Sequence, residues 1–356
     1  MTNQTYAGLL RRKGLVGVVL AVLLLAFALA SLMAGSAGLT LSQVLSALTG
    51  HGTPQQTAIV WNVRLPRVAT AIVVGAALAL SGVVMQNVLR NPLASASTLG
   101  VSQGASFGAA AAIVWLGAGI QVNGSSDAAL TITNPAAVTI CAFAGGIFTT
   151  VVILLLSRLG GVTPSAMVLA GVAISSLFTG ATTLIQYFCD DVMVATVVYW
   201  TFGSLGRAGW GEIALMAAVV LGVAVYVQLH RWDYNAMESG LPIARSLGVP
   251  VDRLVVVSMA LAALAAAVSV AFVGCISFVG LIAPHILRKF VGNDYRFLPL
   301  CSALAGASLL LGADIVSRML VPPAVLPIGA LTSFLGAPLF LWLIVRRGGF
   351  AKGGAV

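Results

Sequence analysis

Residues 68–89 read VATAIVVGAALALSGVVMQNVL and contain no charged side chain. A helix of about 20 apolar residues is long enough to cross the ~30 Å hydrocarbon layer of a bilayer. Backbone polar groups cannot remain unpaired in lipid, so such a segment has to be helical. The stretch therefore predicts a membrane-spanning helix.

The same composition runs through the whole chain of 356 residues, which is 60% hydrophobic and 8% charged. A soluble globule of this size would lack the polar surface needed to cover itself, and the residue alternation typical of an outer-membrane barrel is missing. The net charge of +9 would suggest a nucleic-acid partner in a soluble protein. Here the arginines stand at the ends of apolar runs, so we expect contact with lipid and none with nucleic acid. The sequence predicts an all-α membrane protein.

We predict ten spans within one transmembrane domain that covers residues 1–356. The apolar segments and the breaks between them place the spans at Leu15–Met33, Val68–Leu89, Val101–Leu116, Ala136–Leu156, Met167–Phe188, Ile213–Leu229, Leu254–Val273, Phe278–Leu287, Leu298–Val316 and Ile328–Val345. The eighth is too short to cross alone, so we expect it to be tilted among other helices or continued by residues 274–277.

The basic residues divide unequally between the two sides of these spans. With the amino terminus inside, four lie outside, namely Arg64, Arg67, Arg207 and Arg318. The other fourteen lie inside: Arg11, Arg12, Lys13, Arg90, Arg158, Arg231, Arg245, Arg253, Arg288, Lys289, Arg296, Arg346, Arg347 and Lys352. The positive-inside rule then places both termini in the cytoplasm. The one long polar interval, residues 230–253, is cytoplasmic as well, and its middle alternates apolar and polar residues as a short amphipathic helix would.

The sequence has no sign of catalytic chemistry. None of the three lysines stands in a glycine-rich P-loop, so we do not expect this chain to bind ATP in that way. His51, His230 and His285 are far from one another in sequence. Four single cysteines, at 141, 189, 275 and 301, lack metal-binding spacing and are best interpreted as small apolar fillers. We expect no enzyme activity, no resident metal and no bound cofactor.

Asp314 is the one carboxylate well inside an apolar span. An ionisable group at that depth is by default a functional candidate, such as a proton relay. The alternative, which we favour, is a structural carboxylate that Arg318 satisfies one helical turn later.

The outer arginines Arg64, Arg67 and Arg318 stand on the side where basic residues are otherwise avoided. One interpretation is anchoring to lipid phosphates. The other, which we favour, is an arginine cluster that receives carboxylates of an external protein, because the guanidinium fork suits bidentate pairing.

Two further stretches complete a series of motifs: Gln86–Ala94 with Thr98–Gly100, and Ser277–Arg288. Together with Arg64–Arg67, Ala244–Val249, Ala313–Ile315, Leu326–Gly329 and Leu335–Pro338, they resemble, in order and nearly end to end, the permease subunits of type II ABC importers. That family serves ferric siderophores, haem and cobalamin.

The resemblance implies a ten-helix bundle that pairs with a second copy of itself in a bacterial or archaeal cytoplasmic membrane. Two separate ABC ATPases, which hold ATP and Mg, would power transport, and a periplasmic or lipid-anchored binding protein would deliver the cargo to Arg64, Arg67 and Arg318. The resemblance assigns Met237–Gly248 as the helix that couples to the ATPase, with contacts from Glu238, Ala244, Arg245, Ser246, Leu247 and Gly248. Glu238 enters this set because Leu241 and Pro242 stand where the family usually has an acidic residue.

The resemblance also assigns the fifth span to the translocation path. Path and gate residues would be Thr163, Pro164, Ser165, Ser175 and Ser176. The structural motif residues would be Gln86, Asn91, Pro92, Pro284, His285, Arg288 and Asp314. A ferric siderophore is the expected cargo, with haem and cobalamin as alternatives. A proton-coupled carrier that uses Asp314 is the alternative function, and a passive channel is a third.

Overall fold

The computed structural model describes residues 6–35, 38–120, 131–159, 164–322 and 324–348, and these ranges are almost entirely helical. In chain order the elements are α1 (Tyr6–Met33), α2 (Leu41–Leu48), α3 (Pro54–Ile59), a π-helical turn (Val60–Arg64), α4 (Leu65–Val88), α5 (Val101–Trp115), β1 (Gly119–Ile120), β2 (Thr131–Ile132), α6 (Pro135–Leu159), α7 (Pro164–Tyr187), α8 (Asp191–Thr201), α9 (Trp210–Leu229), α10 (Arg231–Glu238), α11 (Leu241–Ser246), α12 (Val251–Val273), α13 (Val279–Val291), α14 (Leu298–Met319) and α15 (Ile328–Gly348). The two short strands pair antiparallel, with Gly119 opposite Ile132.

Each of the ten predicted segments falls on a helix. By length and composition, seven of the described helices qualify as membrane spans, and α8 and residues 328–342 of α15 are shorter apolar helices. Sequence reasoning missed α2, α3 and α8. It also expected one helix over Met237–Gly248, whereas α10 and α11 are separate helices. The break is at Gly240, whose φ of 121° suits glycine, and Pro242 starts α11.

Helix α4 lies at the centre of the bundle, where it packs against α9, α12, α13 and α14. Glycines allow these helices to approach closely. A Cβ added at Gly82 would overlap the carbonyl of Gly280 on α13, and one at Gly75 would meet the backbone of α14 at Gly306. Gly104 of α5 meets Gly145 of α6 in the same way. Small residues at helix contacts are what permit such close approach between helices in lipid.

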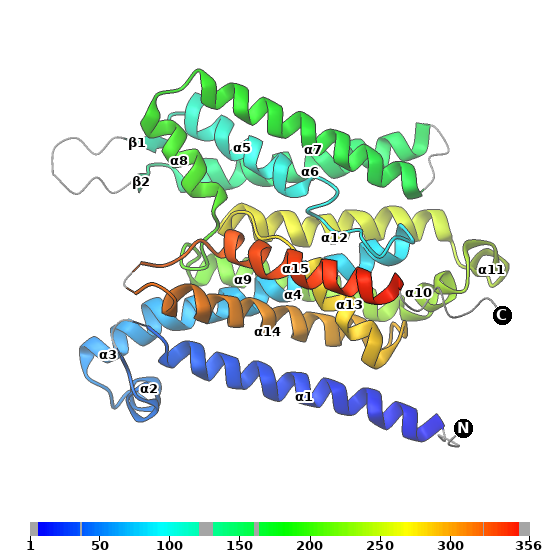
Figure 1. Cartoon of the computed structure of the whole chain (residues 1–356), viewed down its shortest axis with the longest axis horizontal. Coiled ribbons are helices and arrows are strands. Elements are labelled where there is room, and N and C mark those ends of the chain that lie inside the picture. Colours follow the sequence, from blue (N-terminus) through cyan, green and yellow to red (C-terminus); the bar gives the residue numbers. More distant parts are fainter. Residues whose placement is uncertain (1–5, 36–37, 121–130, 160–163, 323, 349–356) are drawn as a thin grey trace.

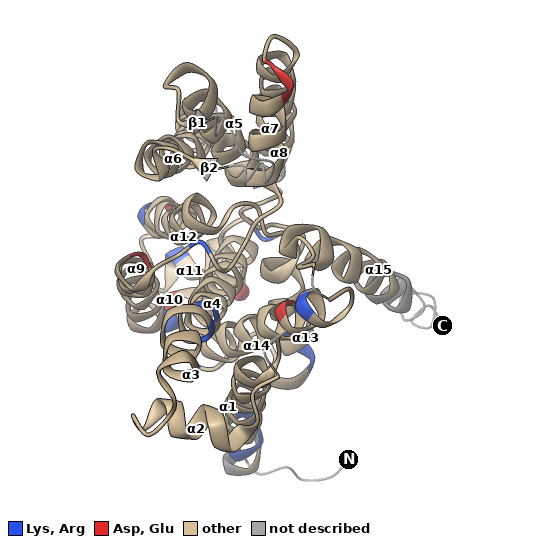
Figure 2. Cartoon of the chain, turned by 90° about the vertical axis from the view of Figure 1, so that its left-hand side faces the viewer, with Lys and Arg blue, Asp and Glu red and all other residues tan. Residues whose placement is uncertain are grey.

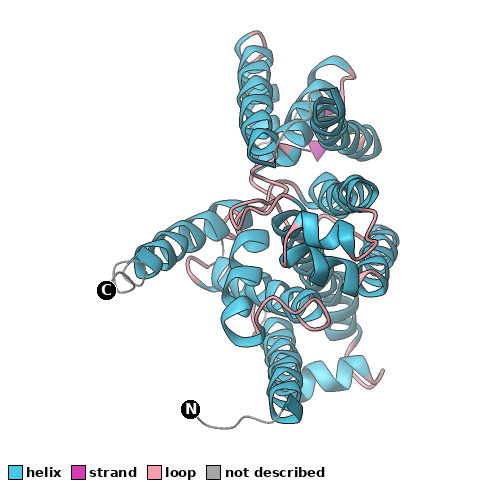
Figure 3. Cartoon of the chain, turned by 90° about the vertical axis from the view of Figure 1, so that its right-hand side faces the viewer, coloured by secondary structure: helices cyan, strands magenta, loops and turns pink. Residues whose placement is uncertain are grey.

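The helices form one elongated bundle (Figure 1). Helices α5, α6, α7 and α8 make up one side of it, α12 lies between this group and α4, and α1 lies on the opposite side. Viewed along the bundle, α15 extends away from the other helices, on the side opposite α9 (Figures 2 and 3).

Two non-helical segments, residues 202–204 and 274–278, meet the start of α15 inside the bundle. The Ser204 amide donates to the Val273 carbonyl (2.7 Å), and the Gly329 amide donates to the Phe202 carbonyl (3.0 Å). Irregular backbone at membrane depth is tolerated where protein surrounds it. The turn at 274–277 therefore does not lengthen α13 as a helix, and α13 remains a short helix packed among α4, α14 and α15.

The two ends of the bundle differ in charge. We call the end formed by α10, α11 and residues 292–297 the α11 end, and the end that holds α2, α3 and residues 202–209 the α3 end. The described basic residues follow the predicted division, since Arg90, Arg231, Arg245, Arg253, Arg288 and Lys289 belong to the α11 end and Arg64, Arg67, Arg207 and Arg318 to the α3 end. Exposed tryptophans occur near both ends, at Trp61, Trp115 and Trp210 and at Trp232 and Trp342. Such placement is typical of the two membrane–water interfaces.

Candidate functional site

A charged cluster at the α3 end joins α4 to α14. Nε of Arg67 lies 2.8 Å from Oδ1 of Asp314, and a terminal guanidinium nitrogen of Arg318 lies 2.8 Å from Oδ2. The Asp314 side chain is fully buried. Arg318 also donates to the Ala34 carbonyl (2.7 Å) and to the Ser31 hydroxyl (2.6 Å), beside the carboxyl end of α1. The cluster thus ties three helices together.

Arg64 belongs to the same cluster and is buried. It lies in the π-helical turn that precedes α4, and its guanidinium donates to the carbonyls of Leu32 and Met33. These are carbonyls of the last turn of α1, which carries a partial negative charge and has no amide partners of its own. Arg64 is the last residue of the π turn and contacts α1 from there. Such single π turns are frequent at functional sites.

Asp314 pairs with Arg318 one turn later and with Arg67 from α4, which are contacts expected of a structural carboxylate. That role for Asp314 stays a prediction. The guanidinium groups of Arg64, Arg67 and Arg318 are largely committed to contacts within the chain. Their docking to an external protein stays a prediction.

At the α11 end, helix α11 presents most of its side chains outward. Arg245, Ser246, Leu247 and Gly248 are exposed, whereas Ala244 is buried against the bundle. Arg245 pairs with Asp252 on the surface, at 3.0 Å. Ile243 on α11 and Leu247 directly after it are therefore exposed apolar side chains that this segment offers to a partner beside the cation Arg245.

Glu238 ends α10 and faces inward rather than outward. Its carboxylate accepts hydrogen bonds from Asn87 and Asn293, both at 2.8 Å, and lies 3.8 Å from the Arg288 guanidinium. We had predicted that Glu238 contacts the ATPase, but its oxygens are engaged by α4, α13 and the loop that follows α13. A polar cavity of about 270 Å³ adjoins these groups and is lined by Gln86, Asn87, Arg90, Pro92, Met237, Glu238 and Arg288.

Two of the predicted motif residues, Gln86 and Arg288, join this network from distant parts of the chain. Arg288 donates to the Gln86 side chain (3.2 Å), and Gln86 donates to the Gly280 carbonyl (3.3 Å). Asn91 closes a turn by accepting from the Leu93 amide (2.9 Å). Within α13, His285 is buried beside the ring of Phe340, one position after Pro284. These residues hold α4, α10 and α13 in fixed positions.

Asp294 forms a second hub at this end, which sequence reasoning missed. It accepts from Lys13 of α1 (3.0 Å) and from Nε and a terminal nitrogen of Arg296 (3.0 and 2.8 Å). Burial alone would raise the pKa of Asp294, but the hydrogen bonds from Arg296 and Lys13 outweigh it and hold the pKa below its ordinary value. The sequence did contain a signal for this ion pair, because Asp294 and Arg296 stand two residues apart in one short loop.

The loop that carries Asp294 is fastened to α10 by Tyr295. Its amide donates to the Asn235 side chain (2.8 Å), its hydroxyl donates to the Val83 carbonyl of α4 (2.9 Å), and its ring stacks on that of Tyr234. Burial raises the pKa of Tyr295, so the phenol remains a neutral donor. The base of α10 is thus locked to both α4 and the α13–α14 loop.

An open cavity of about 430 Å³, with hydroxyl-bearing residues among its lining, lies between α7 and the start of α5. It is lined by Ser97, Thr98, Gln103, Val172, Ser175, Ser176 and Thr179, so it includes the predicted path residues Ser175 and Ser176. Their hydroxyls donate to the carbonyls of Gly171 and Val172 one turn earlier. Pro164 and Ser165 start α7, and the predicted gate residue Thr163 lies outside the described residues. The cavity offers hydroxyl groups along a helix that is otherwise apolar.

Comparison with known proteins accords with this geometry. Residues 23–346 match the model of the FecCD transport family. The hemin transport system permease protein HmuU of Yersinia pestis is 38% identical over 289 residues, which cover 81% of this chain and 84% of HmuU. The vitamin B12 import system permease protein BtuC of Escherichia coli is 39% identical over 296 residues, which cover 83% of this chain and 86% of BtuC. A solved metal-chelate type ABC transporter in an inward-facing conformation superposes with a TM-score of 0.80 at 31% identity, over 93% of this chain and 98% of the other.

Proposed function

Because the chain belongs to the FecCD transport family, we propose that it is the membrane-spanning permease subunit of an ATP-driven importer for a metal chelate. The observation that carries the proposal is the construction of the α11 end. There an exposed helix, α11, follows a second helix, α10, whose polar side chains are bonded to α4, α13 and the α13–α14 loop. A push on α11 would therefore be transmitted directly into the bundle.

The α11 end faces the cytoplasm in this proposal, because most basic residues lie there. All ten predicted segments lie in the membrane, with the shorter helices α5 and α13 shielded from lipid in part by longer neighbours. Two separate ABC ATPases, which bind ATP and Mg, contact α11 through Leu247 and Arg245. Glu238 contributes indirectly, by holding α10 in position.

The translocation path follows α7 and is completed by a second copy of the chain. Supporting this, Leu177 and Leu184 on α7, Phe188 directly after it and Phe334 on α15 are exposed in the single chain. The cavity at Ser175 and Ser176 opens beside α7. Two such half-paths facing each other would enclose a cargo wider than one cavity.

A substrate-binding protein docks at the α3 end. The cluster holds three arginines and one carboxylate, Asp314, which pairs with Arg67 and Arg318, so it keeps a net positive charge that would attract acidic side chains of a partner. The expected cargo is a ferric siderophore. Haem and cobalamin are the next to test, because the relatives HmuU and BtuC are named for hemin and vitamin B12 transport.

The test is uptake into liposomes that contain the chain, its ATPase and its binding protein. Radioactive ferric siderophore, haem and cobalamin are supplied in turn, with ATP or a non-hydrolysable analogue inside. We expect ATP-dependent uptake of at least one chelate. Accumulation driven by a pH gradient without ATP or ATPase would instead establish the proton-coupled alternative, which the two ion pairs of Asp314 already disfavour.

A further inference from the structure

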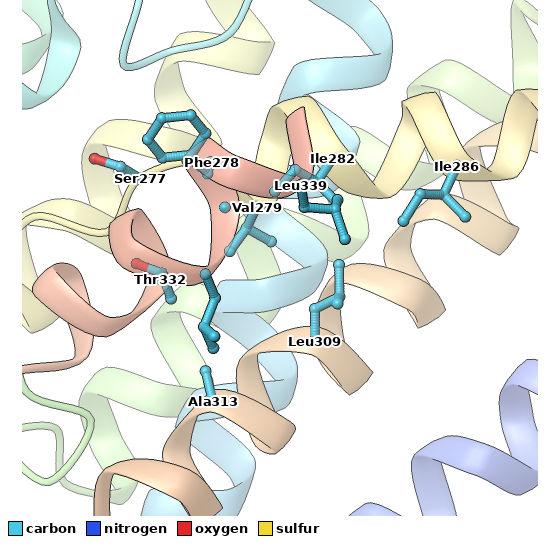
Figure 4. Close-up of a pocket in the computed structure, with 11 residues that line it drawn as sticks. Ser277, Phe278, Val279, Ile282, Ile286, Leu309, Ala313, Thr332 and Leu339 are labelled. Carbon is cyan, nitrogen blue, oxygen red and sulfur yellow. The ribbon is translucent and has the colours of Figure 1, made fainter. Parts of the chain in front are cut away.

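An apolar crevice runs between α13, α14 and α15, about 120 Å³ in volume (Figure 4). Its floor consists of the buried side chains Val279, Ile282 and Ala313, and its rim consists of the exposed side chains Leu309, Leu335 and Leu339. The hydroxyl of Thr332 at one end donates to the Gly329 carbonyl (3.1 Å), so it brings no free donor into the crevice. The lining is thus almost pure hydrocarbon.

Two contacts of α15, one with the residue that precedes α13 and one with α13 itself, border the crevice. Gly336 lies directly against the Phe278 side chain, where a Cβ would overlap it. Phe278 itself has a φ of 66°, which is uncommon for a residue with a side chain. One turn further along, the Phe340 ring meets His285 at 6.2 Å between ring centres. Between these two contacts the side chains of α15 do not fill the space above Ala313.

The position of the crevice determines what can fill it. Leu309 and Ala313 lie in the middle of α14, which qualifies as a membrane span over Leu298–Met319. The same two helices carry further exposed apolar side chains, among them Val316 and Leu341. At this depth the surrounding solvent is bilayer hydrocarbon, and an apolar cavity stays free of water. A cavity of ~150 Å³ with an Ile, Leu and Phe lining binds benzene in another protein, so this volume suits a short length of hydrocarbon.

We propose that this crevice binds an acyl chain of a membrane phospholipid as a structural ligand that supports α15. The acyl chain supplies the van der Waals contacts that Val279, Ile282 and Ala313 lack from protein atoms. It also sets the distance between α15 and α14. The site is independent of the transported cargo and of the ATPase.

The experiment counts phospholipids on the full-length chain. Protein purified in mild detergent is delipidated stepwise, and bound phospholipid is measured by native mass spectrometry for the wild type, for Ala313→Leu and Ala313→Phe, which fill the floor, and for Leu300→Phe. Leu300 is an exposed residue of α14 outside the crevice and serves as the matched control. We expect the wild type and Leu300→Phe to keep the last phospholipid, and the Ala313 variants to lose it at least fivefold more readily.

A second measurement covers the case in which Ala313→Phe does not fold. Adding dioleoyl phosphatidylcholine to delipidated protein should raise the melting temperature of the wild type and of Leu300→Phe by several degrees, and that of Ala313→Leu by clearly less. Equal phospholipid retention in all four proteins would overturn the proposal. So would a loss of dimer, rather than of phospholipid, in the Ala313 variants, since a second copy of the chain would then be the occupant.

Discussion

Arg67 and Asp314 form an ion pair, 2.8 Å from Nε to Oδ1, between positions 247 residues apart in the chain. Arg67 lies in the first turn of α4 and Asp314 lies in α14. The backbones of these two helices are in direct contact further along, at Gly75 and Gly306. A buried charge requires a partner in a medium of low dielectric constant. The pair therefore fixes the register between the two central helices at the α3 end.

Replacing Asp314 by Asn should destabilise the protein strongly. The change leaves Arg67 and Arg318 without their anion, and removing one partner of a buried pair costs about 3–5 kcal/mol. The check is chemical or thermal unfolding of the purified protein in detergent. Asp252→Asn is the control, because the Arg245–Asp252 pair is exposed and such pairs contribute about 0–1 kcal/mol. Equal stability of the two variants would show that the cluster does not hold α4 to α14.

Asp294→Asn should weaken the attachment of α1 and α10 to the α13–α14 loop by about 2 kcal/mol, a magnitude typical of hydrogen bonds to a charged group. Because folding lowers the pKa of Asp294, its contribution is fully present above the unfolded pKa of about 3.9. It is lost as the pH falls through the lower folded value. The difference in melting temperature between wild type and variant should be the same at pH 7 as at pH 5. It should shrink only below about pH 4. A difference that already disappears at pH 5 would contradict this assignment.

Gly82→Ala should force α4 and α13 apart, since its Cβ would overlap the Gly280 carbonyl. Overpacking of a close contact costs about 1–3 kcal/mol and occasionally more. Gly180→Ala on α7 is the matched control, because no atom lies within 4 Å of its added Cβ. The control should melt at the wild-type temperature or slightly above it, as Ala favours helix over Gly by about 0.5–1 kcal/mol. Melting curves that do not separate the two variants would count against the close packing.

Leu247→Glu should weaken ATPase binding without affecting the fold, and this prediction rests on the proposed function. Leu247 is 68% exposed on the α11 end, so its replacement leaves the bundle intact. Loss of an apolar anchor at the centre of an interface costs about 2 kcal/mol or more, roughly a thirtyfold loss of affinity. Affinity for the ATPase is measured by co-purification and by titration in detergent. Leu41→Glu, an exposed leucine at the α3 end, should bind normally, and equal binding by both variants would rule out this contact.

Hydropathy was sufficient to locate the ten predicted segments, because a helix in lipid must satisfy its own backbone and must be apolar along about 20 residues. Hydropathy could not locate α2, α3 and α8. These helices are short and lie between the predicted segments, so they lack the length of a membrane span. Hydropathy also missed the break between α10 and α11, since Gly240 is one glycine among 39 in the chain.

For the candidate site, the sequence by itself determined which residues carry charge in an apolar chain and on which side of the membrane most of them belong. It also paired Asp314 with Arg318, because a spacing of four residues places two side chains on the same helix face. Only the tertiary structure decided that Arg67 completes this pair, that Arg64 caps α1, and that Glu238 and Asp294 face inward to bind Asn87, Asn293, Lys13 and Arg296. These contacts join helices far apart in the chain, and their geometry depends on how closely the glycine-lined helices approach.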